Sequence, residues 1–85
     1  MNPEYLVEMV NDISAFFVTE TDHEQAPKSV ANHISRFWDP RMRREIVAHY
    51  QSAKGVGLSD TSLRAVALLA QQAAAKSTAG THTGS

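Results

Sequence analysis

The residues best suited to metal binding or acid–base chemistry in this chain are four histidines, His23, His33, His49 and His82. No two of them stand four residues apart, as the ligands of a helical zinc site do. A catalytic histidine also needs an oriented partner and a cleft, for which 85 residues leave little room. We therefore predict that the histidines lie at the surface or pack between helices.

Two further patterns resemble sites but have simpler interpretations. Glu4, Glu8 and Asp12 stand four residues apart and form an acidic ridge on a predicted helix. Carboxylates near a helix N-terminus are favoured by the helix dipole and stay hydrated, so a solvated face is the first interpretation and docking to a basic partner the second. Gly55 and Gly57 lack the spacing of a phosphate-binding loop. Neither pattern predicts an active site.

The composition excludes several classes of function. Without cysteine the chain has no disulfide, iron–sulfur ligand, catalytic thiol or cysteine-type zinc site. Eight Lys and Arg against nine Asp and Glu give a net charge of −1, which is unlike a general polyanion binder. The sequence has no uninterrupted run of about 18 apolar residues, so no membrane span is predicted. The acidic N-terminus does not resemble a signal peptide. We expect a cytoplasmic protein that binds no metal or cofactor itself.

Helix start signals and apolar spacing predict two helices in the first half of the chain. The first begins with Asn2 as N-cap and Pro3 at its first position, and it fades into a polar loop over residues 18–22. The second begins near Pro27 and ends before Pro40, because proline disfavours helical geometry at the preceding residue. Their apolar stripes consist of Leu6, Met9, Val10, Ile13, Phe16 and Phe17, and of Val30, Ile34, Phe37 and Trp38.

Two more helices are predicted in the second half. The third starts at once, with Asp39 as N-cap and Pro40 at its first position, and Gly55 follows its end. The fourth is capped by Ser59 and has an Ala- and Leu-rich body over residues 63–75.

These patterns predict an all-α fold, a small bundle of about four short helices. We expect a single helical domain over residues 1–76. Residues 77–85, which are rich in Thr, Gly and Ser, are expected to form a disordered C-terminal tail.

The corner between the second and third predicted helices has the strongest binding signal. It holds four of the eight basic residues and the only tryptophan, while the first 24 residues hold six acidic side chains and no Lys or Arg. In the simpler interpretation its apolar residues form a core corner and its arginines are solvated. We favour a mixed one, in which Phe37 and Met42 pack inward and arginines face a partner. The candidate interface is Arg36, Phe37, Trp38, Asp39, Pro40, Arg41, Met42, Arg43 and Arg44.

The fourth predicted helix carries more apolar surface than an outer helix of a small bundle needs. If Val66, Leu69, Ala70 and Ala73 face the bundle, Leu68 lies on another side and joins the candidate interface. The alternative is that Leu68 is a single ordinary exposed leucine among alanines. The sequence leaves both open.

Two segments, Leu6–Phe17 and His33–Arg43, resemble the delta subunit of NAD-dependent, molybdenum-containing formate dehydrogenase. The run Phe-Trp-Asp-Pro-Arg-Met-Arg, residues 37–43, is the most specific element. The resemblance covers about residues 4–70 and includes the Gly-x-Gly-Leu stretch that begins at Gly55.

The resemblance implies a non-catalytic accessory subunit of a cytoplasmic complex that oxidises formate to carbon dioxide with NAD. In that family the larger catalytic and diaphorase subunits hold the molybdopterin-guanine dinucleotide, the iron–sulfur clusters and FMN, and they are the implied partners. The role would be to support assembly, cofactor maturation or activity. No catalytic residue is implied for this chain.

Two other functions remain open at this point. Arg36, Arg41, Arg43 and Arg44 could contact phosphates while Trp38 stacks on a base, although the net charge of −1 argues against nucleic acid as a partner. The chain could also form a homodimer through its fourth helix. An independent enzyme ranks last.

Overall fold

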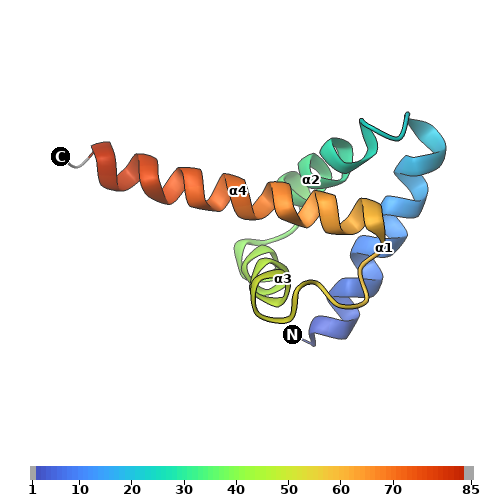
Figure 1. Cartoon of the computed structure of the whole chain (residues 1–85), viewed down its shortest axis with the longest axis horizontal. Helices are drawn as coiled ribbons and strands as arrows, with labels where there is room; N and C mark the ends of the chain where they lie inside the picture. The colour runs from blue at the N-terminus through green and yellow to red at the C-terminus, as the bar shows by residue number, and fades with distance from the viewer. Residues whose placement is uncertain (1, 84–85) are drawn as a thin grey trace.

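The computed structural model describes the backbone of residues 2–83 and the side chains of residues 2–75. Along that backbone the elements are four helices and no strand: α1 (Pro3–Glu20), α2 (Ala26–Phe37), α3 (Pro40–Ala53) and α4 (Asp60–Thr83). Helices α1, α2 and α3 gather around the first half of α4, and the second half of α4 extends away from them (Figure 1). The predicted all-α fold of four helices is confirmed.

Three of the predicted helix starts, those of α1, α3 and α4, are confirmed by capping hydrogen bonds. Asn2 Oδ1 accepts from the Glu4 amide at 2.9 Å, and Asp39 Oδ1 accepts from the Met42 amide at 3.0 Å. Ser59 Oγ accepts from the Ser62 amide at 3.3 Å. Each bond satisfies one of the amides that the first turn of a helix leaves without an intrahelical partner.

The predicted end of the first helix is wrong by a few residues. We expected a loop over residues 18–22, but α1 continues to Glu20. The hydroxyl of Thr19 donates to the Phe16 carbonyl at 2.7 Å and that of Thr21 to the Phe17 carbonyl at 3.1 Å. Polar, β-branched residues are therefore accommodated in the last turn because their side chains bond to the helix backbone.

The far end of the chain is described only in part. Helix α4 has its backbone bounds at Asp60 and Thr83. The predicted disordered tail falls on residues 77–85, whose side chains, together with the backbone of residues 84 and 85, lie outside the described part of the chain. Among the described residues, none of the helices combines the length and the apolar character needed to cross a bilayer.

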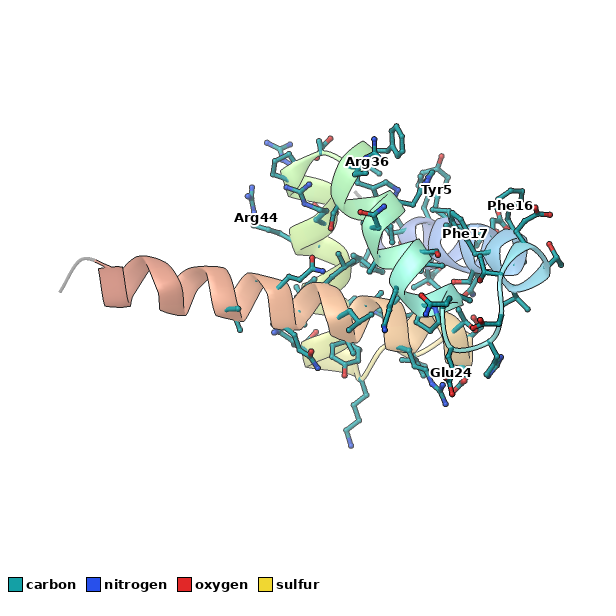
Figure 2. All side chains as sticks on the ribbon, turned by 90° about the horizontal axis from the view of Figure 1, so that it is seen from above. Tyr5, Phe16, Phe17, Glu24, Arg36 and Arg44 are labelled. Atoms are coloured by element: carbon teal, nitrogen blue, oxygen red, sulfur yellow. The ribbon has the colours of Figure 1, made fainter. Side chains whose placement is uncertain are left out.

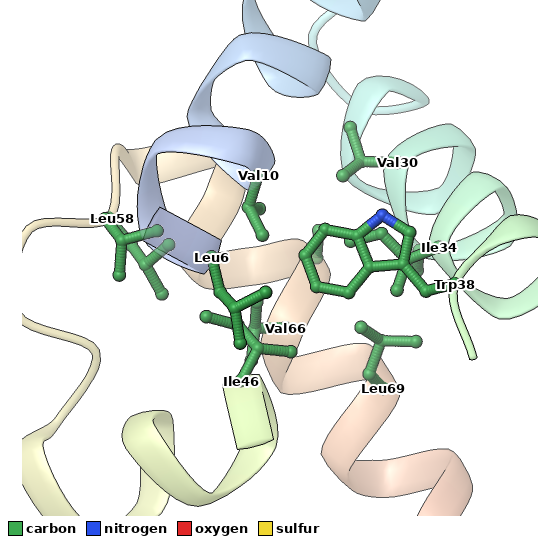
Figure 3. Packing of buried hydrophobic residues seen from close by; sticks show 12 residues of the cluster. Leu6, Val10, Val30, Ile34, Trp38, Ile46, Leu58, Val66 and Leu69 are labelled. Carbon is green, nitrogen blue, oxygen red and sulfur yellow. The ribbon is translucent and has the colours of Figure 1, made fainter. Parts of the chain in front are cut away.

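The core lies where all four helices meet. Leu6, Val10, Ile34, Ile46 and Val66 are fully buried there, and Figure 3 shows them converging from the four helices. Within each helix, apolar residues spaced three and four positions apart form one stripe, and that stripe faces the centre, as the sequence predicts. The charged residues of the predicted acidic ridge on α1, in contrast, are all exposed.

A short chain of hydroxyls crosses this core between α1 and α4. Ser14 Oγ and Ser62 Oγ lie 2.7 Å apart, and both side chains are buried. Ser59 Oγ donates to Ser62 Oγ at 2.9 Å, so the pair is linked to the cap of α4. Since a buried hydroxyl without a partner is costly, the bond between Ser14 and Ser62 fixes the relative position of the two helices.

The loop between α3 and α4 is tied to α1 by one side chain. Asn11 Nδ2 donates to the Gly57 carbonyl at 3.0 Å, and Asn11 Oδ1 accepts from the Ser59 amide at 2.9 Å. An amide side chain that both donates and accepts can bond two backbone groups in the second half of this loop at once. Asn11 therefore fixes the position of the backbone immediately before α4.

Replacing Asn11 by alanine is expected to lower the free energy of unfolding by about 1–2 kcal/mol, because two hydrogen bonds are lost. Urea denaturation followed by circular dichroism measures the change. Asn32→Ala is the matched control: Asn32 is exposed in the middle of α2, and its replacement should shift stability by no more than about 0.5 kcal/mol. Equal effects of the two substitutions would contradict the role of Asn11.

Candidate functional site

The structure divides the predicted interface at the α2–α3 corner into buried and exposed parts. Trp38 is only 6% exposed and belongs to the core, whereas Phe37 is 68% exposed. The prediction that Phe37 packs inward is wrong, and that for Met42, which is partly buried against the core, is confirmed. With its indole buried, Trp38 is not available to stack on a base, so the nucleic-acid hypothesis loses its aromatic component.

The burial of Trp38 and the exposure of Phe37 follow from their spacing to the preceding turn of α2. Phe37 is its last residue, and Trp38 has extended backbone angles, φ −84° and ψ 144°. The Trp38 amide still donates to the Ile34 carbonyl at 3.0 Å, so the Trp38 side chain lies one helical turn after buried Ile34, whereas Phe37 lies one turn after half-buried His33. Asp39 then uses its carboxylate to cap α3.

The arginines of the corner have different roles. Arg43 Nη1 donates to the carbonyls of Ser35 at 2.8 Å and Trp38 at 3.3 Å, and it thereby satisfies the end of α2. Arg36, Arg41 and Arg44 are exposed, as is Pro40. With Phe37 and Asp39, these exposed side chains are the part of the corner that a partner can reach without a change of the fold. Leu68, predicted as an interface residue or a lone exposed leucine, is half-buried and packs against the core.

A row of aromatic side chains, exposed at its two ends and half-buried in the middle, lies across α1 and α2, and we call it the aromatic ladder. It consists of Phe16, Phe17, His33 and Phe37, with Arg36 at its end (Figure 2 labels Phe16, Phe17 and Arg36). Ring centroids are 5.2 Å apart for Phe16–Phe17, 6.0 Å for Phe17–His33 and 4.8 Å for His33–Phe37. The Arg36 guanidinium lies 5.7 Å from the Phe37 centroid.

The helices position the ladder by simple spacing. His33 and Phe37 stand four residues apart on α2, so their rings stack one turn apart. Phe16 and Phe17 are adjacent on α1, about 100° apart around the helix, so only Phe17 packs partly against the core. Phe16 is left 58% exposed.

The ladder uses all three phenylalanines of the chain, and none of them is a buried core residue. Phenylalanine is usually buried in soluble domains, and a contiguous exposed aromatic surface is typical of protein–protein contacts. The sequence analysis placed the three residues on core stripes and missed this surface. The signals that could have revealed it are the adjacent Phe16 and Phe17 and the four-residue spacing of His33 and Phe37.

The three histidines whose side chains are described have different surroundings. His33 is part of the ladder, and His49 Nε2 lies 2.9 Å from the Val56 carbonyl, so both pack between structural elements as predicted. His23 is exposed, and the side chain of His82 lies outside the described residues. Within residues whose side chains are described, no three His, Asp or Glu side chains are grouped in a way that could hold a metal ion.

The fold and the ladder define a small all-helical domain with an exposed aromatic surface of the kind found in protein–protein interfaces. A comparison with family models matches residues 5–66 to the NADH-dependent formate dehydrogenase delta subunit FdsD. The chain belongs to this family, and the resemblance inferred from the sequence is confirmed. Searches of curated proteins and of solved structures give no match. The matched range contains the whole aromatic ladder.

Proposed function

We propose that this chain is a non-catalytic accessory subunit of a cytoplasmic formate dehydrogenase complex and that it binds a larger subunit through the aromatic ladder. The family to which it belongs supports membership of such a complex. The observation that carries the docking surface is that Phe16 and Phe37 are 58% and 68% exposed although the chain has a core in which to bury them.

The energetics of the ladder favour association with a protein. Full burial of a phenylalanine side chain contributes about 1.5–3 kcal/mol relative to its exposure to water. The contacts among the rings and with Arg36 hold them in a fixed arrangement, which reduces the entropy lost when a partner covers them. Aromatic residues and arginine are also the residue types that most often dominate binding energy.

The redox chemistry of formate oxidation is assigned to the partner subunits in this proposal. The chain has no cysteine with which to ligate an iron–sulfur cluster. The molybdopterin-guanine dinucleotide, iron–sulfur clusters, FMN and NAD would then be bound by the larger catalytic and diaphorase subunits. The role of this chain would be to support their assembly, cofactor maturation or activity.

The double substitution Phe16→Ala and Phe37→Ala is expected to reduce co-purification with the larger subunits at least about tenfold, because two exposed contact residues are removed. The tagged chain is co-produced with the other subunits, and the recovered large subunit is quantified. Because both residues are exposed helix positions, circular dichroism of the isolated variant should remain helical.

Val56→Ala is the control, because Val56 is an equally exposed large apolar residue (69%) in the α3–α4 loop, outside the ladder. It should co-purify like the parent chain. Unchanged recovery of the large subunit with the double variant would show that the ladder is not the docking surface. If the parent chain itself recovers no other subunit, the proposed membership of the complex is wrong.

A further inference from the structure

A second surface lies away from the aromatic ladder, between α3 and the projecting half of α4. An open groove of about 990 Å³ runs between these helices. Arg43, Arg44 and Val47 line it from α3, and Leu69, Ala70 and Ala73 line it from α4. Figure 2 shows Arg44 on the side toward the projecting half of α4, with Phe16 and Phe17 at the opposite end of the bundle.

The groove continues the core stripe of α4 beyond the bundle. Val66 and Leu69 are buried, and Ala70 and Ala73 follow them at spacings that keep them on the same face of the helix. Ala73 is exposed. The stripe thus extends over a part of α4 that the other three helices do not cover (Figure 1). Because most helical stability in proteins comes from packing of the apolar face, this part of α4 would be stabilised by a partner that covers the stripe.

The charge of the groove restricts what can occupy it. Its wall carries Arg43 and Arg44 and, among the described residues, no carboxylate. Arg43 is fixed by its bonds to the end of α2, while Arg44 is exposed at the rim. A complementary partner presents Asp or Glu to this rim.

The small side chains of α4 restrict the shape of the partner. Where alanines form the contact, a second helix can approach to the short end of the usual interaxial range of about 8–10 Å. The partner helix then supplies the large apolar side chains that fill the groove. A symmetric contact with a second copy is disfavoured, because a two-fold axis pairs this surface with itself, and among the described residues that line the groove there is no carboxylate to complement its arginines.

We propose that the α3–α4 groove receives an amphipathic helix from another subunit of the complex, with large apolar residues against Ala70 and Ala73 and carboxylates beside Arg44. This inference rests on the proposed membership of the complex, but it concerns a surface separate from the aromatic ladder. The mode of contact is that of a helix laid in a hydrophobic groove, with anchors spaced three and four residues apart.

The first test places a carboxylate in the groove. Ala73→Glu is expected to weaken co-purification with the other subunits at least about tenfold, because a buried, unpaired charge would face the partner's apolar residues. Gln71→Glu introduces the same residue at an exposed position of the same helix that lies off the groove wall, and it should have little effect. Equal recovery with both variants would overturn the proposal.

The second test reverses the charge of the rim. Arg44→Glu should weaken co-purification and Arg41→Glu should not, since Arg41 is exposed on the same helix but does not line the groove. The two variants have the same net charge. A loss of equal size in both would show a general electrostatic effect and would contradict a carboxylate seated beside Arg44.

The third test identifies the occupant. A photo-reactive amino acid at position 73 of the tagged chain, in the assembled complex, should cross-link to an amphipathic helical segment with acidic residues in another subunit. A cross-link to a second copy of this chain, or to a basic or non-helical segment, would overturn the proposal. Absence of a cross-link from a complex that still depends on Phe16 and Phe37 would overturn the groove assignment alone. Failure of the parent chain to enter the complex would instead refute the proposed function.

Discussion

Trp38→Ala is expected to lower the free energy of unfolding by about 3–5 kcal/mol, the range for removing a large aromatic side chain from a core. The indole lies between α1, α2 and α4, beside Val10, Ile34 and Leu69 (Figure 3). The loss is a large share of the roughly 5–15 kcal/mol that holds a small domain folded. Urea denaturation monitored by circular dichroism should show a clearly lower midpoint, or a chain already partly unfolded without urea.

Trp38→Phe is the matched control for this substitution. It retains most of the buried apolar area, and we expect a smaller cost than for alanine, because less of the cavity is left empty. If Trp38→Ala were as stable as the parent chain but failed to bind the larger subunits, Trp38 would be an interface residue after all. Weak co-purification of Trp38→Ala is therefore informative only when the folded fraction is measured in parallel.

Gly55→Ala is the second substitution with a large expected effect, about 2–5 kcal/mol of lost stability. Gly55 has φ +69°, a conformation that side-chain-bearing residues rarely adopt. A Cβ there would lie 2.5 Å from Leu63 Cδ2 and 3.1 Å from Leu58 Cδ1. The side chains on either side of the α4 cap would have to move, and thermal unfolding should show a lower midpoint.

The neighbouring residue, Lys54, provides a control substitution that should not lower the stability. Lys54 also has a positive φ, +58°, as the C-cap of α3. Lys54→Gly should therefore leave stability unchanged or raise it, by up to about 1 kcal/mol, since glycine adopts this conformation without steric cost. If Gly55→Ala were neutral, or Lys54→Gly strongly destabilising, the backbone conformation assigned to this loop would be wrong.

The helix starts could be predicted because capping is a local property. Asn2, Asp39 and Ser59 each precede a helix, and the side-chain oxygen of each reaches an amide two or three residues later. Proline at the first position of α1 and α3 needs no amide partner, which strengthens the same signal. The stripes that face the core followed from helical spacing for the same reason.

The candidate site was harder to predict, because it depends on which of two adjacent residues is buried. Phe37 and Trp38 both fit the stripe of α2, and which of them is buried depends on the side from which the other helices cover that stripe. The aromatic ladder likewise requires α1 and α2 to be placed side by side, which periodicity in one sequence does not report.

The central position of α4 also has a consequence for synthesis on the ribosome. This helix packs against each of the other three, and it supplies Ala65, Val66 and Leu69 to the core. Until residues 60–69 have emerged, the apolar stripes of α1, α2 and α3 lack the surface that covers them. The nascent chain therefore gains its tertiary structure only after residues 60–69 have been made, and the aromatic ladder is presented on a stable support only from then on.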